Sequence, residues 1–359
     1  MNALERVAAA IQRQDLDRVP VYPLINSISR LYTNSTYALW SRDVDVCAES
    51  ILRATEDMGL DVICSIQDLS VEAADWGLPI IYPEHEAAHP DYQNRLVHEI
   101  EDYRKIEPID PRQGERMGKH IELCDRLVKA RGKDTPIVAF VFAPLGVLSM
   151  MRGQADMFMD CYDDPDAMHP ALEAITQTLD LYCRALIETG VHAVMFDTLF
   201  ASQSIMSKDM WVDMEAPYVK RLCDSVRSYG AMPMLHNCGK GTYFDVQIQY
   251  MDPVAISFLY PPDDCIDFAG AKAKYGDRTL IGAITPSWIL SATKEQVLEE
   301  SRLEIEAMAE GGGFILATGC EYPSNGGIEN AKAMVEAVKE YGRYAPGLKL
   351  LGRAEPVLA

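Results

Sequence analysis

The chain has 359 residues, of which 48% are hydrophobic and 24% are charged, and its formal net charge is −21 at pH 7. This composition is that of a globular protein with a large core, and the length suits either two average domains or one large α/β barrel. The negative charge is spread along the chain, which argues against binding to nucleic acid or to an anionic membrane surface.

Short apolar runs alternate with amphipathic segments along nearly the whole chain. The runs are rich in Val, Ile, Leu and Phe with little polar alternation, which is typical of parallel strands covered on both faces. They span residues 18–24, 61–66, 135–142, 191–197, 231–238, 253–260, 278–284 and 312–319. The segments between them carry helix start and stop signals, such as the Asp-Pro that opens 164–190 and the glycine that ends it. Eight strand–helix units predict an α/β fold, a (β/α)8 TIM barrel.

The stretch from about residue 75 to 134 does not fit one strand–helix unit, and its first part is rich in Pro, His and charged residues. We expect an insertion after the second strand. No repeat or low-complexity linker divides the chain. The prediction is therefore a single barrel domain over residues 1–359, with extra helices.

The cysteines and the amino terminus indicate the compartment. The first residues place charges among their apolar residues at helical spacing, unlike a signal peptide, and no apolar run reaches the length that spans a bilayer. The nine cysteines are dispersed and lie mainly in apolar contexts. We expect a reduced, cytoplasmic protein without membrane segments.

Three potential metal ligands lie at the ends of two predicted strands. His236 and Cys238 end the run at 231–238, and Cys320 follows the run at 312–319. Because the active sites of such barrels lie at the carboxyl ends of the strands, we expect these side chains to meet. The alternative is a core histidine and two buried thiols, since a lone His-x-Cys pair has little specificity and cysteine is commonly buried.

One nitrogen and two sulfur ligands with an open fourth position are typical of a catalytic zinc site. Zinc lowers the pKa of a thiol, so that a substrate thiol binds as thiolate at neutral pH. The two thiolate ligands donate charge to the metal, and we infer that the bound sulfur stays nucleophilic. The pattern therefore predicts a zinc enzyme whose substrate thiol attacks an electrophilic methyl group.

Three carboxylates are expected at the same barrel mouth. Asp197 ends the run at 191–197, and Asp68 and Glu72 follow the run at 61–66. Asp197 either orients a substrate or caps a helix. Asp68 and Glu72 either anchor water or a metal-bound group, or form a solvated pair in a loop. We predict catalytic roles for all three.

The order of "FDTLFASQSIMSKDMWVDMEAPYVKRL", "HNCG", "LIGAITP" and "GGGFILATGCEYP" resembles the uroporphyrinogen decarboxylase superfamily, and within it the zinc-dependent cobamide methyltransferases. The resemblance covers almost the whole chain. It implies zinc on His236, Cys238 and Cys320. It also implies transfer of a methyl group between a corrinoid, methylcobalamin on a carrier protein, and a thiol such as coenzyme M. The direction of transfer stays open.

Two segments depart from the patterns of the superfamily. The resemblance to the decarboxylases would imply several arginines after the first strand, which bind the carboxylates of a porphyrinogen. In this chain the corresponding segment, "YPLINSISRLYTNS", holds only Arg30. After the sixth strand, "SFLYPPDDCID" leaves Tyr260, Asp263 or water as the fourth zinc ligand. Acceptors other than coenzyme M, including another thiol or a folate, therefore remain open.

Three further interpretations follow from these segments. A metal-free lyase of the decarboxylase type is the alternative enzyme. A zinc-stabilised partner of a corrinoid protein, without turnover of its own, is the alternative outside catalysis. The methionine-rich segment 148–160 is either packed among helices or forms an apolar rim on which a corrinoid carrier protein docks.

Overall fold

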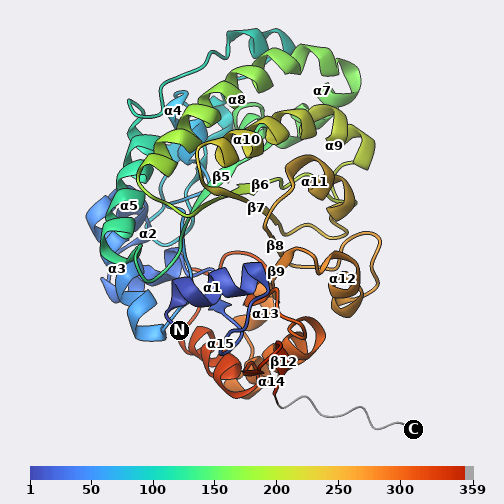
Figure 1. The fold of residues 1–359 in the computed structure, drawn as a ribbon. Coiled ribbons are helices and arrows are strands. Elements are labelled where there is room, and N and C mark those ends of the chain that lie inside the picture. The colour runs from blue at the N-terminus through green and yellow to red at the C-terminus, as the bar shows by residue number, and fades with distance from the viewer. Residues whose placement is uncertain (352–359) are drawn as a thin grey trace.

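In the computed structural model, which describes residues 1–351, eight parallel strands form one curved sheet surrounded by helices (Figure 1). The strands are β1 (Val21–Tyr22), β2 (Ile63–Ser65), β5 (Ile137–Phe142), β6 (Ala193–Asp197), β7 (Met232–Asn237), β8 (Ala255–Phe258), β9 (Thr279–Ile284) and β10 (Phe314–Thr318). Their order in the sheet is β1-β10-β9-β8-β7-β6-β5-β2. Each strand lies inside one of the eight predicted runs, so the predicted (β/α)8 barrel is confirmed.

Asp61 joins the two ends of the sheet. Its backbone N–H donates to the carbonyl of Val21 at 3.0 Å, and its carboxylate accepts from the N–H of Val21 at 2.8 Å. Arg6 and Arg18 hold the same buried carboxylate, Arg6 at 2.7 Å and Arg18 at 2.6 Å. A buried carboxylate is stable when it is paired and hydrogen-bonded in this way, and here it brings β1 beside β2.

The strands are apolar because both of their faces are covered. Every residue of β5, β6, β9 and β10 is buried. The helices of the outer layer are α1 (Ala3–Gln12), α2 (Tyr37–Arg42), α3 (Val44–Met58), α5 (Glu115–Arg131), α8 (Pro165–Glu188), α10 (Ala216–Ser228), α11 (Phe244–Met251), α12 (Phe268–Tyr275), α14 (Lys294–Met308) and α15 (Glu329–Glu340). Local signals set their ends. The Asp164 side chain accepts from the N–H of Ala167 at the start of α8, and Thr293 and Gln296 form a capping box on α14.

The chain between β2 and β5 forms the predicted insertion. It contains α4 (Val71–Asp75), the antiparallel pair β3 (Ile80–Ile81) and β4 (His89–Pro90), and the 3-10 turns η2 (Tyr92–Asn94) and η3 (Ile100–Lys105) before α5. The additional short elements elsewhere are η1 (Ser27–Tyr32), α6 (Pro144–Arg152), α7 (Gln154–Asp163), α9 (Lys208–Met214), α13 (Pro286–Ile289) and the pair β11 (Tyr344–Ala345) and β12 (Lys349–Leu350).

The predicted single domain extends to residue 359, and its last part, residues 352–359, lies outside the described residues. Among residues 1–351, no helix combines the length and the apolar character needed to cross a bilayer.

Candidate metal centre

The barrel brings the three predicted metal ligands together. One ligand atom from each of His236, Cys238 and Cys320 lies within 4.8 Å of the other two. His236 is near the end of β7, Cys238 directly follows that strand, and Cys320 follows β10. Since β8 and β9 separate β7 from β10 in the sheet, the ligands meet across the barrel mouth.

Gly319 allows the chain to carry Cys320 to this position. A Cβ atom built on Gly319 would lie 2.5 Å from Cα of Leu259, closer than side-chain carbon atoms approach a backbone. The backbone after β10 therefore passes against the segment after β8 only because residue 319 has no side chain.

The imidazole of His236 is held in one orientation. Its Nδ1 lies 2.9 Å from the hydroxyl of Ser257 on β8, which leaves Nε2 as the nitrogen available to a metal. Its ring packs against that of Phe140, with 5.7 Å between the centroids. Burial opposes protonation of His236, but the hydrogen bond with Cys320 and the charge of Asp197 raise its pKa above the ordinary value.

The two thiols interact directly with each other. A hydrogen bond from Cys238, together with the nearby His236, lowers the pKa of Cys320 to about 4, although burial opposes the shift. The same contact and burial raise the pKa of Cys238. Cys320 is therefore the sulfur of the pair that ionises more readily. Two sulfurs and an imidazole nitrogen this close together form a donor set suited to a soft divalent ion such as zinc.

The other seven cysteines have different surroundings. All nine cysteines are free, and burial raises the pKa of each thiol outside the cluster. Cys265, which follows β8, is half-buried and contacts Asp264. Neutral thiols of this kind are poor ligands and poor nucleophiles, and the lowered pKa of Cys320 distinguishes it from them.

A cavity of about 310 Å³ opens in front of the cluster. The cluster residues themselves lie in its wall, and the insertion supplies part of its rim, including His89 and Tyr92. The wall is mainly apolar, with a few polar groups. Its apolar side chains are Leu24, Ile66, Leu69, Phe140, Phe142, Met150 and Leu199, and its polar ones include Asn26, Ser70, Ser149, Gln154, Asp197 and Glu321. This mixture is typical of a site for a small ligand.

Asp197 is the predicted carboxylate that reaches the cavity. It ends β6, is paired with His236 across the neighbouring strands, and is 7% exposed. Its Oδ1 has no hydrogen-bond partner among the described residues. Burial and the nearby Cys320 raise the pKa of Asp197 to about 7, while His236 acts in the opposite direction. An unsatisfied buried carboxylate is costly to the fold, and such groups gather at functional sites.

Asp68 and Glu72 lie behind the cavity wall rather than in it. Asp68 forms an ion pair with Arg116 and accepts from the N–H of Ser70 at 2.8 Å. Glu72 accepts from the N–H of Phe142 at 3.1 Å, and burial raises its pKa to about 8. Neither carboxylate joins the ligand cluster, but both hold the backbone of a residue that lines the cavity.

The two protein side chains considered as fourth ligands are also elsewhere. Tyr260 is 38% exposed, and the carboxylate of Asp263 pairs with Lys208 at 3.1 Å. Neither lines the cavity or belongs to the described cluster. Arg30 is likewise outside the cavity wall, and its guanidinium donates to the carbonyl of Ser324 at 3.0 Å.

Three parts of the site were not predicted from the sequence: Ser257, Glu321 and the β3–β4 hairpin. Ser257 is directly opposite His236 in the β7–β8 pairing, and it is the one polar residue in the apolar run "AISF". That interruption next to a predicted ligand strand was the available signal. Glu321 directly follows Cys320, whereas nothing local indicated that the hairpin would contribute His89 and Pro90 to the cavity.

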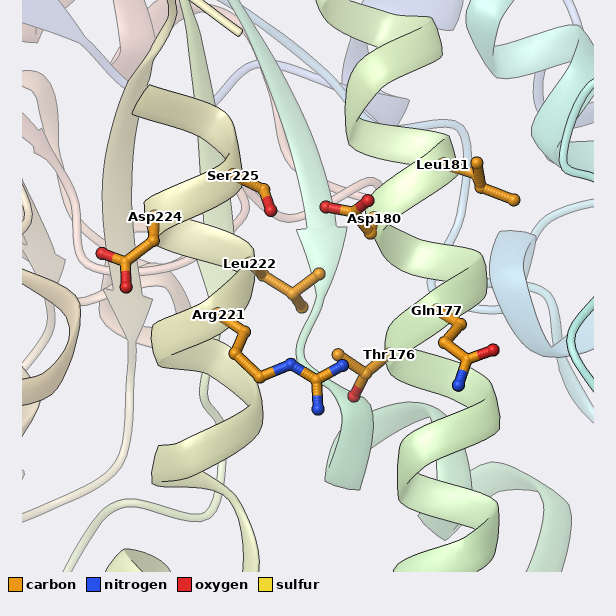
Figure 2. Close-up of a pocket in the computed structure, with 8 residues that line it drawn as sticks. All are labelled: Thr176, Gln177, Asp180, Leu181, Arg221, Leu222, Asp224 and Ser225. Carbon is orange, nitrogen blue, oxygen red and sulfur yellow. The ribbon is translucent and has the colours of Figure 1, made fainter. Parts of the chain in front are cut away.

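A second hollow, of about 590 Å³, lies outside the barrel between α8 and α10 (Figure 2). Its lining includes Thr176, Gln177, Asp180, Arg221 and Ser225, without histidine or cysteine among the described residues. Arg221 is paired with Glu173 at 2.6 Å. This groove therefore has a mixed polar and apolar lining, and it contains none of the three residues His236, Cys238 and Cys320.

Comparison with known proteins gives relatives of two kinds. The chain is 26% identical over 236 residues to the methylcobamide:CoM methyltransferase MtaA of Methanosarcina barkeri, covering 65% of this chain and 67% of the relative. It is 23% identical over 364 residues to a uroporphyrinogen decarboxylase of Pseudoalteromonas atlantica, covering 95% of this chain and 98% of the relative.

Among solved structures, a methyltransferase from Methanosarcina mazei matches with a TM-score of 0.78 at 20% identity, covering 95% of this chain and 99% of that one. This likeness supports the barrel fold. The family model described as uroporphyrinogen decarboxylase (URO-D) matches residues 2–341. The resemblance predicted from the motifs is thus confirmed, and the chain belongs to the uroporphyrinogen decarboxylase family.

Proposed function

We propose that the protein is a zinc-dependent methyltransferase that moves a methyl group between a corrinoid on a carrier protein and a thiol. The observation that carries the proposal is the convergence of one imidazole and two thiols, within 4.8 Å of one another, on the wall of a cavity. The family relationship to a methylcobamide:CoM methyltransferase supports it.

His236, Cys238 and Cys320 would hold the zinc ion, because their nitrogen and two sulfurs are a donor set that this metal prefers. Three protein ligands leave a fourth position for a substrate, as in catalytic rather than structural zinc sites. Bound zinc would lower the pKa of a substrate thiol, so that the thiol is present as thiolate at neutral pH. Ser257 keeps Nε2 of His236 directed to the ion by holding Nδ1.

The remaining groups bind the substrate and shape the cavity. The unpaired Oδ1 of Asp197 accepts a hydrogen bond from the substrate, which satisfies that buried oxygen. Glu72 and Asp68 act as positioning residues, because they fix the backbone of Phe142 and Ser70 in the wall. The apolar side chains of the wall exclude water from the sulfur that reacts.

The proposed methyl transfer is a single displacement at the methyl carbon. The bond between cobalt and the methyl carbon breaks, and both of its electrons stay on cobalt. A bond forms between the methyl carbon and the thiolate sulfur, and the thiol proton has left for the solvent. Transfer from a methylated thiol to reduced cobalt is the reverse of the same step and uses the same side chains.

The carrier protein would present the corrinoid at the cavity mouth. The helix α7 begins at Gln154, which lines the cavity, and exposes Met159 and Tyr162 by 58% and 74%. Exposed Met and aromatic side chains are enriched at protein interfaces. We place this reaction in the cytoplasm, where the free cysteines of the chain stay reduced.

The test is methyl transfer from free methylcobalamin to thiols, followed by the change in cobalamin absorbance, with and without a zinc chelator. We expect transfer by the wild type, loss of transfer with chelator, and loss in Cys320→Ala. Cys265→Ala is the matched control, since Cys265 is half-buried and outside the cluster, and it should keep full activity.

Full transfer after zinc removal, or full transfer by Cys320→Ala, would contradict the proposal. A metal-free protein that decarboxylates a porphyrinogen would support the alternative lyase. A wild type that binds zinc and a corrinoid protein but transfers no methyl group would support a role as a non-enzymatic partner.

A further inference from the structure

The cavity in front of the ligand cluster has acidic side chains but no strongly basic ones. Asp197 and Glu321 line it, and among its described lining residues none is Arg or Lys. Glu321 accepts from the backbone N–H of Ser27 at 3.0 Å and from the Ser27 hydroxyl. Both donors are uncharged, so these two contacts give the Glu321 carboxyl group no cationic partner. Apart from His89 and His236, the described side chains that line this cavity are uncharged or acidic.

Three arginines outside the lining are paired with carboxylates that are also outside it, whereas the guanidinium of Arg30 donates to the carbonyl of Ser324. The pairs are Arg95 with Asp156, Arg116 with Asp68, and Arg152 with Asp160. The Arg152–Asp160 contact is 2.7 Å, and both of these side chains are buried. Recruiting Arg116 or Arg152 to a substrate would leave a buried carboxylate unpaired. Asp156, the partner of Arg95, is 43% exposed, so this constraint applies to Arg116 and Arg152.

We propose that this site selects a small thiol whose body carries no anionic group, and that it discriminates against thiols with a sulfonate or carboxylate. The inference rests on the proposed function and names the substrate class of the same site. Two cysteine thiolates already balance the charge of a zinc ion. A second negative charge on the substrate would lose its hydration in the cavity without gaining a cation.

The neutral groups of the wall fit the selected class. Asn26 and Ser70 offer hydrogen bonds to a hydroxyl or an ammonium group, and the apolar side chains contact a short hydrocarbon body. The formal net charge of −21 also disfavours anionic thiols, since a negative protein surface lowers the local concentration of anions.

The test compares three thiols that share a two-carbon body and differ in the terminal group. 2-Mercaptoethanol ends in a hydroxyl, cysteamine in an ammonium group, and coenzyme M in a sulfonate. Their binding to the zinc-loaded protein is measured by calorimetry at low salt, and each Kd is corrected for the thiolate fraction of the free thiol. We expect coenzyme M to bind about tenfold more weakly than 2-mercaptoethanol, or weaker still, a difference of about 1.4 kcal/mol.

A matched pair of variants tests whether the cavity itself causes the selectivity. Gln154→Lys adds a cation at the cavity rim and should improve the binding of coenzyme M several-fold, without changing that of 2-mercaptoethanol. Gln177→Lys makes the same substitution in the outer groove between α8 and α10 (Figure 2). It changes the net charge equally and should leave the ratio of the two Kd values unchanged.

The outcomes separate this inference from the proposed function. Equal or tighter binding of coenzyme M, no binding of any of the three thiols, or an equal effect of the two lysine variants would overturn the inference. Methyl transfer from methylcobalamin is measured separately with the same thiols. The expected binding order without any methyl transfer would overturn the proposed function alone, and transfer with a preference for coenzyme M would overturn the inference alone.

Discussion

Replacing Ser257 with alanine removes the hydroxyl that lies 2.9 Å from Nδ1 of His236. Ser257 is fully buried and His236 is 2% exposed, so bulk water does not replace the lost partner. An unsatisfied buried donor costs about 1–3 kcal/mol. Outer partners of metal-binding histidines typically contribute about 10–100-fold to metal affinity, which corresponds to about 1.4–2.7 kcal/mol. We therefore expect the Kd for zinc to rise by about 10–100-fold in Ser257→Ala.

The assay is competition for zinc between the protein and a chromophoric chelator of known affinity. Ser301→Ala is the control, because Ser301 is also fully buried but its hydroxyl has no hydrogen-bond partner among the described residues. It removes the same atom without removing a hydrogen bond, so its zinc affinity should match the wild type. An unchanged Kd in Ser257→Ala would show that the contact with Nδ1 does not orient a metal ligand.

Three further predictions concern the groups around the cluster. Asp197→Asn should keep one zinc per chain but lower kcat/KM for methyl transfer by about tenfold or more, since an amide replaces the unpaired carboxylate. Wild-type kinetics in this variant would refute the proposed contact between Asp197 and the substrate. Glu72 has a pKa of about 8 in the fold against an ordinary 4.5, so the native state binds more protons between these values and loses stability as pH rises through them. Glutamine at position 72 cannot ionise, so the free energy of unfolding of Glu72→Gln minus that of the wild type should increase from about pH 5 to about pH 9. Urea titrations should show an increase on the order of a few kcal/mol. A difference that stays constant with pH would contradict the raised pKa of Glu72. Gly319→Ala should lower both the free energy of unfolding and the affinity for zinc, because its Cβ would lie 2.5 Å from Cα of Leu259. Gly327→Ala is the control and should change neither, because nothing lies within 4 Å of its Cβ. Equal effects of the two substitutions would refute the close approach at Gly319.

The barrel could be predicted because its strands are buried on both faces. A run such as residues 135–142 contains β5 (Ile137–Phe142), and the run at 278–284 contains β9 (Thr279–Ile284). The strand at 18–24 is shorter than predicted, with only Val21 and Tyr22 in β1. Pro20 and Pro23 flank this pair, and a proline has no N–H to donate to the sheet.

The convergence of the three candidate ligands could be predicted because the topology of a barrel directs the carboxyl end of every strand to one face. This rule placed His236, Cys238 and Cys320 together without any knowledge of distances. The carboxylates after β2 could not be assigned in the same way. The orientation of Asp68 depends on Arg116, which is 48 residues later in the chain, and no local pattern indicates such a pair.

X-ray absorption at the zinc edge, on protein loaded with one equivalent of zinc, identifies the atoms that bind the ion. His236, Cys238 and Cys320 predict two sulfur neighbours at about 2.3 Å and one imidazole nitrogen at about 2.0–2.1 Å, with a light atom in the fourth position. Saturation with 2-mercaptoethanol should raise the number of sulfur neighbours from two to three. A zinc ion without two sulfur neighbours, or a sulfur count that stays at two with saturating thiol, would contradict the proposed binding of zinc and substrate thiol at this site.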